Sequence, residues 1–147
     1  MGKEKTIEIL IYSVTLAGIL AASYTDWKRH KIPLYIFPPV FMAALSGRML
    51  TGAWVLESFA GFGVVLFASL LASFAGMGGG DVIMLSTIAF VVGSRQVVPF
   101  FLLMATLVLL YAVYRKCIRK DRRKLRVPLA PFCILPYLYS FFSFLCS

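Results

Sequence analysis

The chain has 147 residues, of which 61% are hydrophobic, and its mean hydropathy is +0.88. A soluble domain is typically about half apolar, so this composition excludes an ordinary water-soluble fold and indicates that lipid is the solvent. Fifteen Lys and Arg against six Asp and Glu give a formal charge of +9, which fits nucleic acid or anionic lipid as a partner. The hydropathy favours anionic membrane lipid.

The hydropathy predicts an all-α, polytopic membrane protein with about six transmembrane helices in a single domain, residues 1–147. A bilayer core of about 30 Å needs roughly 20 helical residues for each crossing. The first run also resembles a cleaved signal peptide, but the apolar remainder of the chain favours a retained span. In chain order the predicted spans are residues 6–24, 34–50, 55–74, 82–92, 97–114 and 127–146.

The fourth and fifth spans come from splitting one long apolar region. As a single helix, residues 82–114 would measure about 50 Å, which is too long for one crossing. The segment at residues 93–96 and the nearby Pro99 offer a break. We therefore predict two spans, of which the fourth is only about half the usual length.

The distribution of basic residues supports this split and sets the sides of the membrane. If the loop at residues 26–33 is cytoplasmic, crossing alternation also places residues 76–81 and 115–126 there. Three basic residues of the first loop and eight of the last then lie inside, as the positive-inside rule requires. The last run is interpreted as a topology anchor at anionic lipid rather than a nucleic-acid site.

Neither cysteine nor histidine spacing predicts a metal site or a cofactor. The three cysteines form no CxxC pair, and His30 is the single histidine. Cys117 is expected to be a reduced cytoplasmic thiol, whereas Cys133 and Cys146 are interpreted as small apolar packing residues. His30 lies near Asp26 in sequence, where it could tune the pKa of Asp26, but the simpler interpretation is one more interfacial polar residue.

Two aspartates lie on the same predicted membrane face. Asp26 ends the first span and Asp81 precedes the fourth, so two crossings separate them and their depths are similar. Two carboxyl groups held close in a poorly solvated site cannot both ionise easily. The ionised member can take a proton from water while the protonated member polarises a carbonyl, which is aspartic-protease chemistry.

A structural alternative exists for each aspartate. A single Asp at a helix end is often a cap or an interfacial anchor, and for Asp26 alone the two interpretations are balanced. For Asp81 a functional role is favoured, because burying an acidic side chain in a membrane costs free energy and such residues usually have a function. Glu57 falls near the outer end of the third span and is interpreted as interfacial.

The glycines before Asp81 also have two interpretations. They can form a tight turn or a small-residue packing face between helices. They can instead keep the backbone open, so that an extended substrate strand approaches Asp81. On the residues alone the two are nearly balanced. The glycines concerned are Gly76, Gly78, Gly79 and Gly80.

Three motifs together resemble the type IV prepilin peptidase family of intramembrane aspartyl proteases. The segment GMGGGD resembles the GxGD motif, and DWKRHKIP resembles the signature in which a span-ending Asp precedes basic residues and Ile-Pro. The segment VPLAPFCILPYL is similar to the proline-rich last helix of the family. The matching residues are Asp26, Arg29, Ile32 and Pro33; Gly78, Gly79, Gly80 and Asp81; and Pro128, Ala130, Pro131 and Phe132.

The resemblance implies an endopeptidase of the prokaryotic cell membrane that uses Asp26 and Asp81 as catalytic residues, without a cofactor. It implies cleavage of pilin-like, pseudopilin-like or preflagellin-like precursors at the cytoplasmic membrane face. The chain lacks the CxxC-containing cytoplasmic insertion of larger members and is similar to the compact form, so we predict proteolysis without N-methylation. The implied substrate-binding residues are Gly78, Gly79, Gly80, Pro33 and Pro131.

Two departures from the family pattern and two alternative functions remain. Leu34 stands where the family often carries Asn, and Ile83 stands where it often carries Lys, which affects activity and substrate choice more than fold. One alternative is a small proton- or cation-coupled transporter or assembly component that uses both acids. Another is a related GxGD protease of ordinary transmembrane helices, which the Ile-Pro signature and the short chain disfavour.

Overall fold

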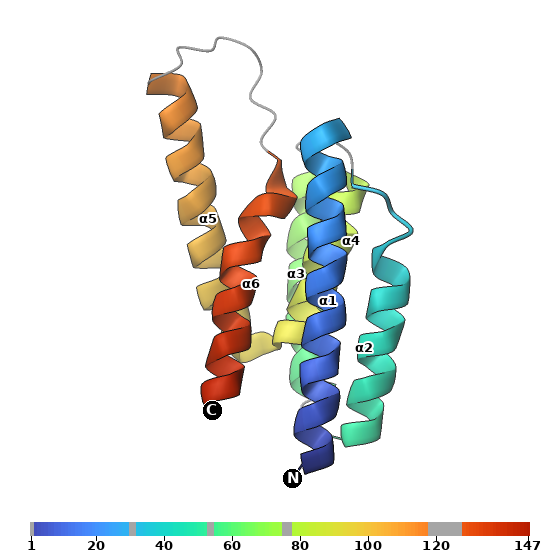
Figure 1. Ribbon diagram of the computed structural model, residues 1–147. Coiled ribbons are helices and arrows are strands. Elements are labelled where there is room, and N and C mark those ends of the chain that lie inside the picture. The colour runs from blue at the N-terminus through green and yellow to red at the C-terminus, as the bar shows by residue number, and fades with distance from the viewer. Residues whose placement is uncertain (1, 30–31, 53–54, 75–77, 118–127) are drawn as a thin grey trace.

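The computed structural model describes residues 2–29, 32–52, 55–74, 78–117 and 128–147. Within these ranges the chain forms six helices and no strand, which confirms the all-α prediction (Figure 1). The expectations for Gly76, for His30 and for residues 118–126 of the basic run lie outside the described residues. The helices are α1 (Gly2–Arg29), α2 (Phe37–Thr51), α3 (Val55–Phe74), α4 (Gly79–Val92), α5 (Ser94–Cys117) and α6 (Leu129–Cys146).

Four of the helices are long and apolar enough to cross a membrane, namely α1, α3, α5 and α6. The other two are shorter, with 15 residues in α2 and 14 in α4. At 1.5 Å per residue, α4 is only about 21 Å long, so it falls short of the roughly 30 Å hydrocarbon core. The predicted short fourth span is therefore confirmed as a short helix.

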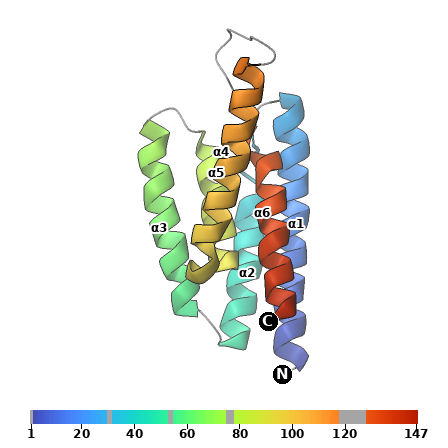
Figure 2. The same cartoon turned by 90° about the vertical axis from the view of Figure 1, so that its left-hand side faces the viewer.

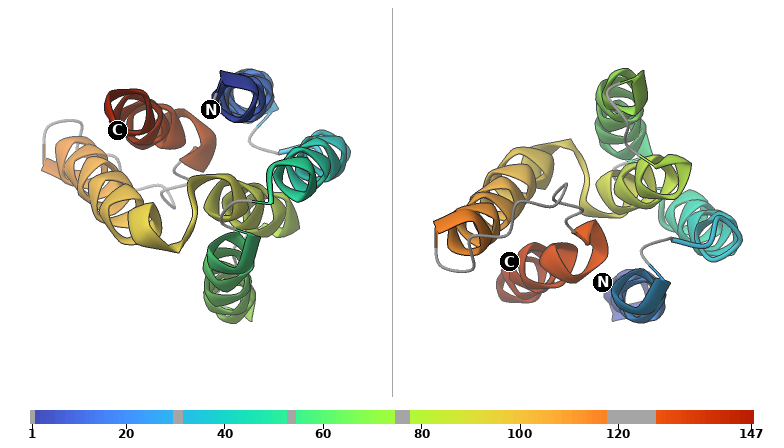
Figure 3. Two further views of the ribbon diagram at one scale, coloured as in Figure 1. Left: turned by 90° about the horizontal axis from the view of Figure 1, so that it is seen from below. Right: turned by 90° about the horizontal axis from the view of Figure 1, so that it is seen from above.

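Helix α4 lies at the centre of the bundle. It packs against each of the other five helices, and the end-on views show it surrounded (Figure 3). Every residue from position 84 to 92 is buried. A helix that is apolar all round is expected to be buried in this way. Because α4 contacts all five other helices, its first and last turns lie at the centre of the two ends of the bundle.

The break between α4 and α5 is made by Gly93 alone. Gly93 has φ +78°, a conformation that glycine adopts without strain, and its N–H donates to the Ala89 carbonyl oxygen at 3.0 Å. Pro99 lies inside α5, so the expectation that it contributes to the break is wrong. The fixed φ of proline is compatible with helical geometry, and α5 continues through it.

Helices α1 and α6 lie side by side, and their N-terminal and C-terminal ends meet at the same end of the molecule (Figures 1 and 2). The Tyr137 hydroxyl donates to the Tyr12 carbonyl oxygen at 3.0 Å. The Tyr12 ring stacks on Phe141 and Phe144, with centroid distances of 5.3 and 5.2 Å. These contacts fix α6 against α1, and so set the position of the first turn of α6 at the opposite end.

Candidate active site

Asp26 lies near the end of α1, where its side chain faces the first turn of α6. The residue is only 6% exposed, and its carboxyl oxygen Oδ2 accepts a hydrogen bond from the Ala130 N–H at 3.3 Å. Ala130 is the second residue of α6, so its N–H has no carbonyl partner within the helix. This hydrogen bond fixes the Asp26 carboxyl group at the start of α6.

Asp81 lies in the first turn of α4 and is half-buried. Gly78 is the N-cap of this helix, and its backbone is hydrogen-bonded to the Asp81 carboxyl group. An acidic side chain at the third helical position that reaches back to the N-cap is the reciprocal half of a capping box. This contact anchors the carboxyl group at the helix start while leaving it partly accessible.

The two carboxyl groups converge at the same end of the bundle. They lie within electrostatic reach of one another. The Cys133 thiol, one turn after Ala130 in α6, is fully buried and lies within electrostatic reach of both. The structure therefore brings Asp26 and Asp81 together between α1, α4 and α6.

The glycines before Asp81 play different structural parts. A Cβ at Gly80 would lie 2.5 Å from the Ile32 carbonyl oxygen, so the loop after α1 approaches α4 through the missing side chain. At Gly79, by contrast, no described atom lies within 4 Å of such a Cβ. Gly78 and Gly79 are both exposed. Gly80 is thus a packing glycine that joins the two aspartate-bearing segments, and Gly79 leaves open backbone beside Asp81.

The two predicted substrate-binding prolines flank the pair. Pro33 is half-buried, directly follows Ile32, and accepts a hydrogen bond from the Ile36 N–H at 3.4 Å in the turn that leads to α2. Pro131 is half-buried in the first turn of α6, directly after Ala130. Each proline therefore directly follows a residue, Ile32 or Ala130, whose backbone group positions the site. Their binding role stays a prediction.

The two departures from the family pattern, Ile83 and Leu34, lie in different surroundings. Ile83 is partly buried and packs against the hydrophobic core, where a lysine would bring a charge toward apolar neighbours. Leu34 is 56% exposed in the loop between α1 and α2. Among the described residues, no three His, Cys, Asp or Glu side chains come together as a metal-binding group.

Comparison with protein-family models matched residues 13–113 to the type IV leader peptidase family. The chain belongs to this family. The matched range includes Asp26, Asp81 and the glycines that precede Asp81 in sequence, but ends before α6. Comparisons with curated proteins and with solved structures found no match.

Membership of the type IV leader peptidase family confirms the resemblance that the motifs predicted, and the apolar helices agree with a multi-pass membrane protein. The family connects the chain with leader-peptidase function. The family match does not reach α6, so the contact of Ala130 with Asp26 rests on the structure, which places the predicted proline-rich last helix beside the site.

One charged pair was missed by the sequence analysis. Glu8 of α1 and Arg48 of α2 are both buried and face each other at the end of the bundle opposite the aspartates. The signal was present, because each is a charged residue inside an otherwise apolar predicted span. Their pairing across 40 positions could not be read from spacing.

Proposed function

We propose that the chain is an intramembrane aspartyl endopeptidase that removes the leader peptide from prepilin-like precursors at the cytoplasmic membrane face. The observation that carries this proposal is the convergence of Asp26 and Asp81 at one end of the bundle. Family membership supports a leader-peptidase function, and the carboxyl pair supplies the chemistry for it.

The proposed mechanism uses the pair as one unit. One carboxyl group is ionised and takes a proton from a water molecule, whose oxygen attacks the carbonyl carbon of the scissile peptide. The other is protonated and donates to the carbonyl oxygen, forming a tetrahedral intermediate. When the C–N bond breaks, the leaving nitrogen takes a proton from one carboxyl group and a hydroxyl group of the intermediate returns a proton to the other, so the pair again holds one proton. Ala130 positions Asp26 throughout, whereas the half-buried Asp81 meets the substrate.

An apolar groove supports a membrane-embedded substrate. It has a volume of about 590 Å³ and lies between α3 and α5 over α4. Its lining includes Leu129, the neighbour of Ala130, and Leu85, one helical turn after Asp81. The apolar helix of a precursor would rest in this groove, with the bond before it at the carboxyl pair.

The proposed orientation rests on charge. In the sequence, the segments at residues 26–33 and 115–126 carry three and eight basic residues, whereas the opposite end of the bundle carries Lys3, Lys5, Arg48 and Arg95. By the positive-inside rule this excess of basic residues supports an orientation in which the aspartate end faces the cytoplasm, where the leader of a precursor would lie.

The proposal is tested by incubating purified wild type, Asp26→Asn and Asp81→Asn with a prepilin-like precursor in liposomes. We expect each substitution to lower the cleavage rate by at least about 100-fold, because each removes an acid–base group. Glu57→Gln, at the opposite end, is the matched control and should cleave normally. Full cleavage by either Asn variant contradicts the proposal, and proton flux without proteolysis favours the transporter alternative.

Absence of N-methylation is proposed separately. Wild type is incubated with precursor and S-adenosylmethionine, and the mass of the new N-terminus is measured. We expect the mass of the unmodified amine. A gain of one methyl group would contradict this part while leaving the endopeptidase proposal intact.

A further inference from the structure

The apolar groove between α3 and α5 comes close to the carboxyl pair at the first turns of α6. Two residues that line the groove, Met104 of α5 and Leu129 of α6, both contact Cys133. The Cys133 thiol lies 3.5 Å from Met104 Sδ and 3.4 Å from the carbonyl oxygen of Leu129, one turn earlier on the same face of α6. The groove wall at this point therefore rests on Cys133.

Cys133 connects this wall to the carboxyl pair. It lies three positions after Ala130, whose N–H binds Asp26, so the two residues share a face of α6. Its thiol lies within electrostatic reach of both Asp26 and Asp81. Because Cys133 itself is fully buried, a substrate in the groove meets Met104 and Leu129 rather than the thiol.

The wall is filled by side chains and leaves little free space. Met104 is 8% exposed, and Leu85, which lines the groove one turn after Asp81, is 3% exposed. Leu129 is half-buried. These side chains present hydrocarbon and a thioether toward the groove. A substrate side chain that lies against them must therefore be apolar, and its size is limited by the space that they leave.

The position of that substrate side chain follows from the proposed function, on which this inference rests. The apolar helix of a precursor lies in the groove, and the scissile peptide lies at the carboxyl pair. An extended residue spans only about 3.5 Å, so few residues connect the two. The residue directly after the scissile bond is the first of them, and it lies against the wall.

We propose that Met104, together with Leu129, determines the largest side chain that is accepted directly after the scissile bond. Removing side-chain atoms from either residue enlarges the space at the wall and admits a larger substrate residue. In an apolar pocket, a difference of one methylene group changes the discrimination between substrates by about tenfold or more.

The test compares two precursors that differ only in this residue, Leu in one and Trp in the other. Their kcat/KM values are measured in liposomes. For Met104→Ala we expect the Trp-to-Leu ratio to rise at least about tenfold above that of wild type. Leu129→Ala should shift the ratio in the same direction, so the inference is tested even if Met104→Ala does not fold. Met104→Leu conserves volume and should keep the ratio of wild type.

Leu102→Ala is the matched control. Leu102 lines the same groove, but it is 65% exposed and lies two positions before Met104, on a different side of α5. Its truncation should change both rates in parallel. The ratio compares two substrates on one preparation, so a loss of folded protein cancels.

Two kinds of failure are distinguishable. An unchanged ratio in the folded wall variants, or an equal shift in Leu102→Ala, overturns the inference while cleavage by wild type leaves the endopeptidase proposal intact. If wild type cleaves neither precursor, the endopeptidase proposal fails and this inference fails with it.

Discussion

Among the described glycines, Gly80 makes the closest approach to another segment, with the Ile32 carbonyl oxygen 2.5 Å from a Cβ placed there. This contact joins the loop that follows α1, the helix of Asp26, to the first turn of α4, which carries Asp81. The site thus depends on the absence of one side chain. The neighbouring Gly79 has free space around it. Gly80 therefore serves helix–loop packing, whereas Gly79 is expected to serve substrate access.

Gly80→Ala should destabilise the protein. The added methyl group meets backbone rather than a flexible side chain, so we expect a loss of about 1–3 kcal/mol and a lower thermal midpoint in detergent. Cleavage should fall as well, because Asp26 and Asp81 lose their common support. Gly79→Ala is the matched variant: it should keep the thermal midpoint and raise KM if open backbone admits the substrate. Equal thermal midpoints for the two variants would contradict the packing role of Gly80.

The aspartates could be predicted from sequence, whereas the groups that hold them could not. Charge and span counting assign Asp26 and Asp81 to one membrane face, because each crossing reverses the side. Ile32 and Ala130 belong to segments that resemble the family, but their contacts are made by a backbone carbonyl oxygen and a backbone N–H, which residue type does not predict. The same applies to Glu8 and Arg48, whose pairing follows from the packing of α1 against α2.

At the scale of elements, α4 organises the bundle through close helix–helix contacts. A Cβ at Gly61 of α3 would lie 3.1 Å from the Ala89 carbonyl oxygen and 3.2 Å from the Ser94 backbone nitrogen. Small residues allow such approach between membrane helices. Both α3 and α4 were predicted from the sequence. The hydrophobic pattern did not show, however, that α4, the shortest helix, lies at the centre of the bundle.

Gly61→Leu should therefore push α3 away from α4. We expect a loss of about 1–3 kcal/mol, because the new side chain has no room beside the α4 backbone. Gly63→Leu, on the same helix and with no described atom within 4 Å of its Cβ position, should leave the thermal midpoint unchanged or raise it. A larger destabilisation by Gly63→Leu would show that the contact of α3 with α4 is assigned to the wrong face.

The groove between α3 and α5 gives a second prediction at this scale. Ala105 is exposed and lines the groove, so Ala105→Trp should obstruct the apolar helix of a precursor. We expect kcat/KM for a full precursor to fall about tenfold, which corresponds to roughly 1.4 kcal/mol. Leu109→Trp, exposed on the same helix but outside the groove, is the control. Equal rates for the two variants would exclude the groove as the substrate path.

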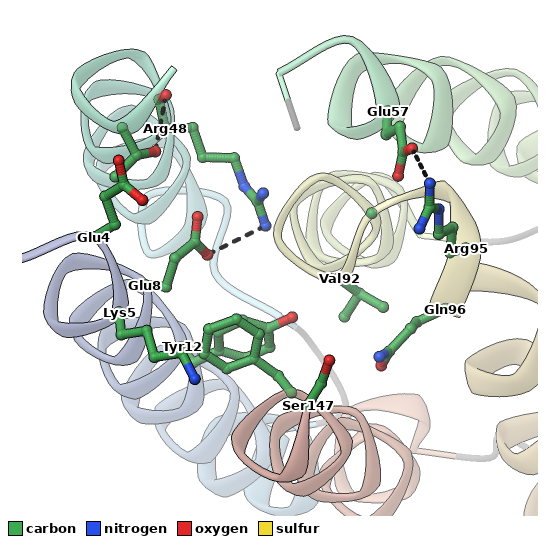
Figure 4. A pocket seen from close by; sticks show the side chains of 13 residues that line it. Glu4, Lys5, Glu8, Tyr12, Arg48, Glu57, Val92, Arg95, Gln96 and Ser147 are labelled. Atoms are coloured by element: carbon green, nitrogen blue, oxygen red, sulfur yellow. Dashed lines mark hydrogen bonds and ion pairs between the residues drawn. The ribbon is translucent and has the colours of Figure 1, made fainter. Parts of the chain in front are cut away.

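At the scale of the whole molecule, the six-helix arrangement puts the carboxyl pair at one end of the bundle and a cavity of about 360 Å³, lined by residues that include Glu8 and Arg48, at the other (Figure 4). The central helix α4 is too short to span the membrane. The space beyond its last turn is therefore lined by other helices and by charged side chains. Helix number, helix order and the break before α5 were predicted from hydropathy and charge. The cavity was not, because it depends on where α4 lies relative to its longer neighbours.

The sidedness of the fold is testable through its natural cysteines. Cys117 ends α5 at the aspartate end, Cys146 ends α6 at the opposite end, and both are exposed, whereas Cys133 is buried. In single-cysteine variants, a membrane-impermeant maleimide should label Cys146 in intact cells and Cys117 only in inverted vesicles. Cys133 should react only after denaturation. Labelling of Cys117 in intact cells would reverse the proposed orientation.

The central claim is that Asp26 and Asp81 act as one catalytic unit. It is tested most directly by measuring precursor cleavage rates for Asp26→Asn, Asp81→Asn and the double variant under single-turnover conditions. Groups that act as a unit give strongly non-additive losses. We predict that all three variants cleave at the same background rate. Substantial cleavage by either single variant, or a double variant slower by the product of the two single losses, would contradict the account.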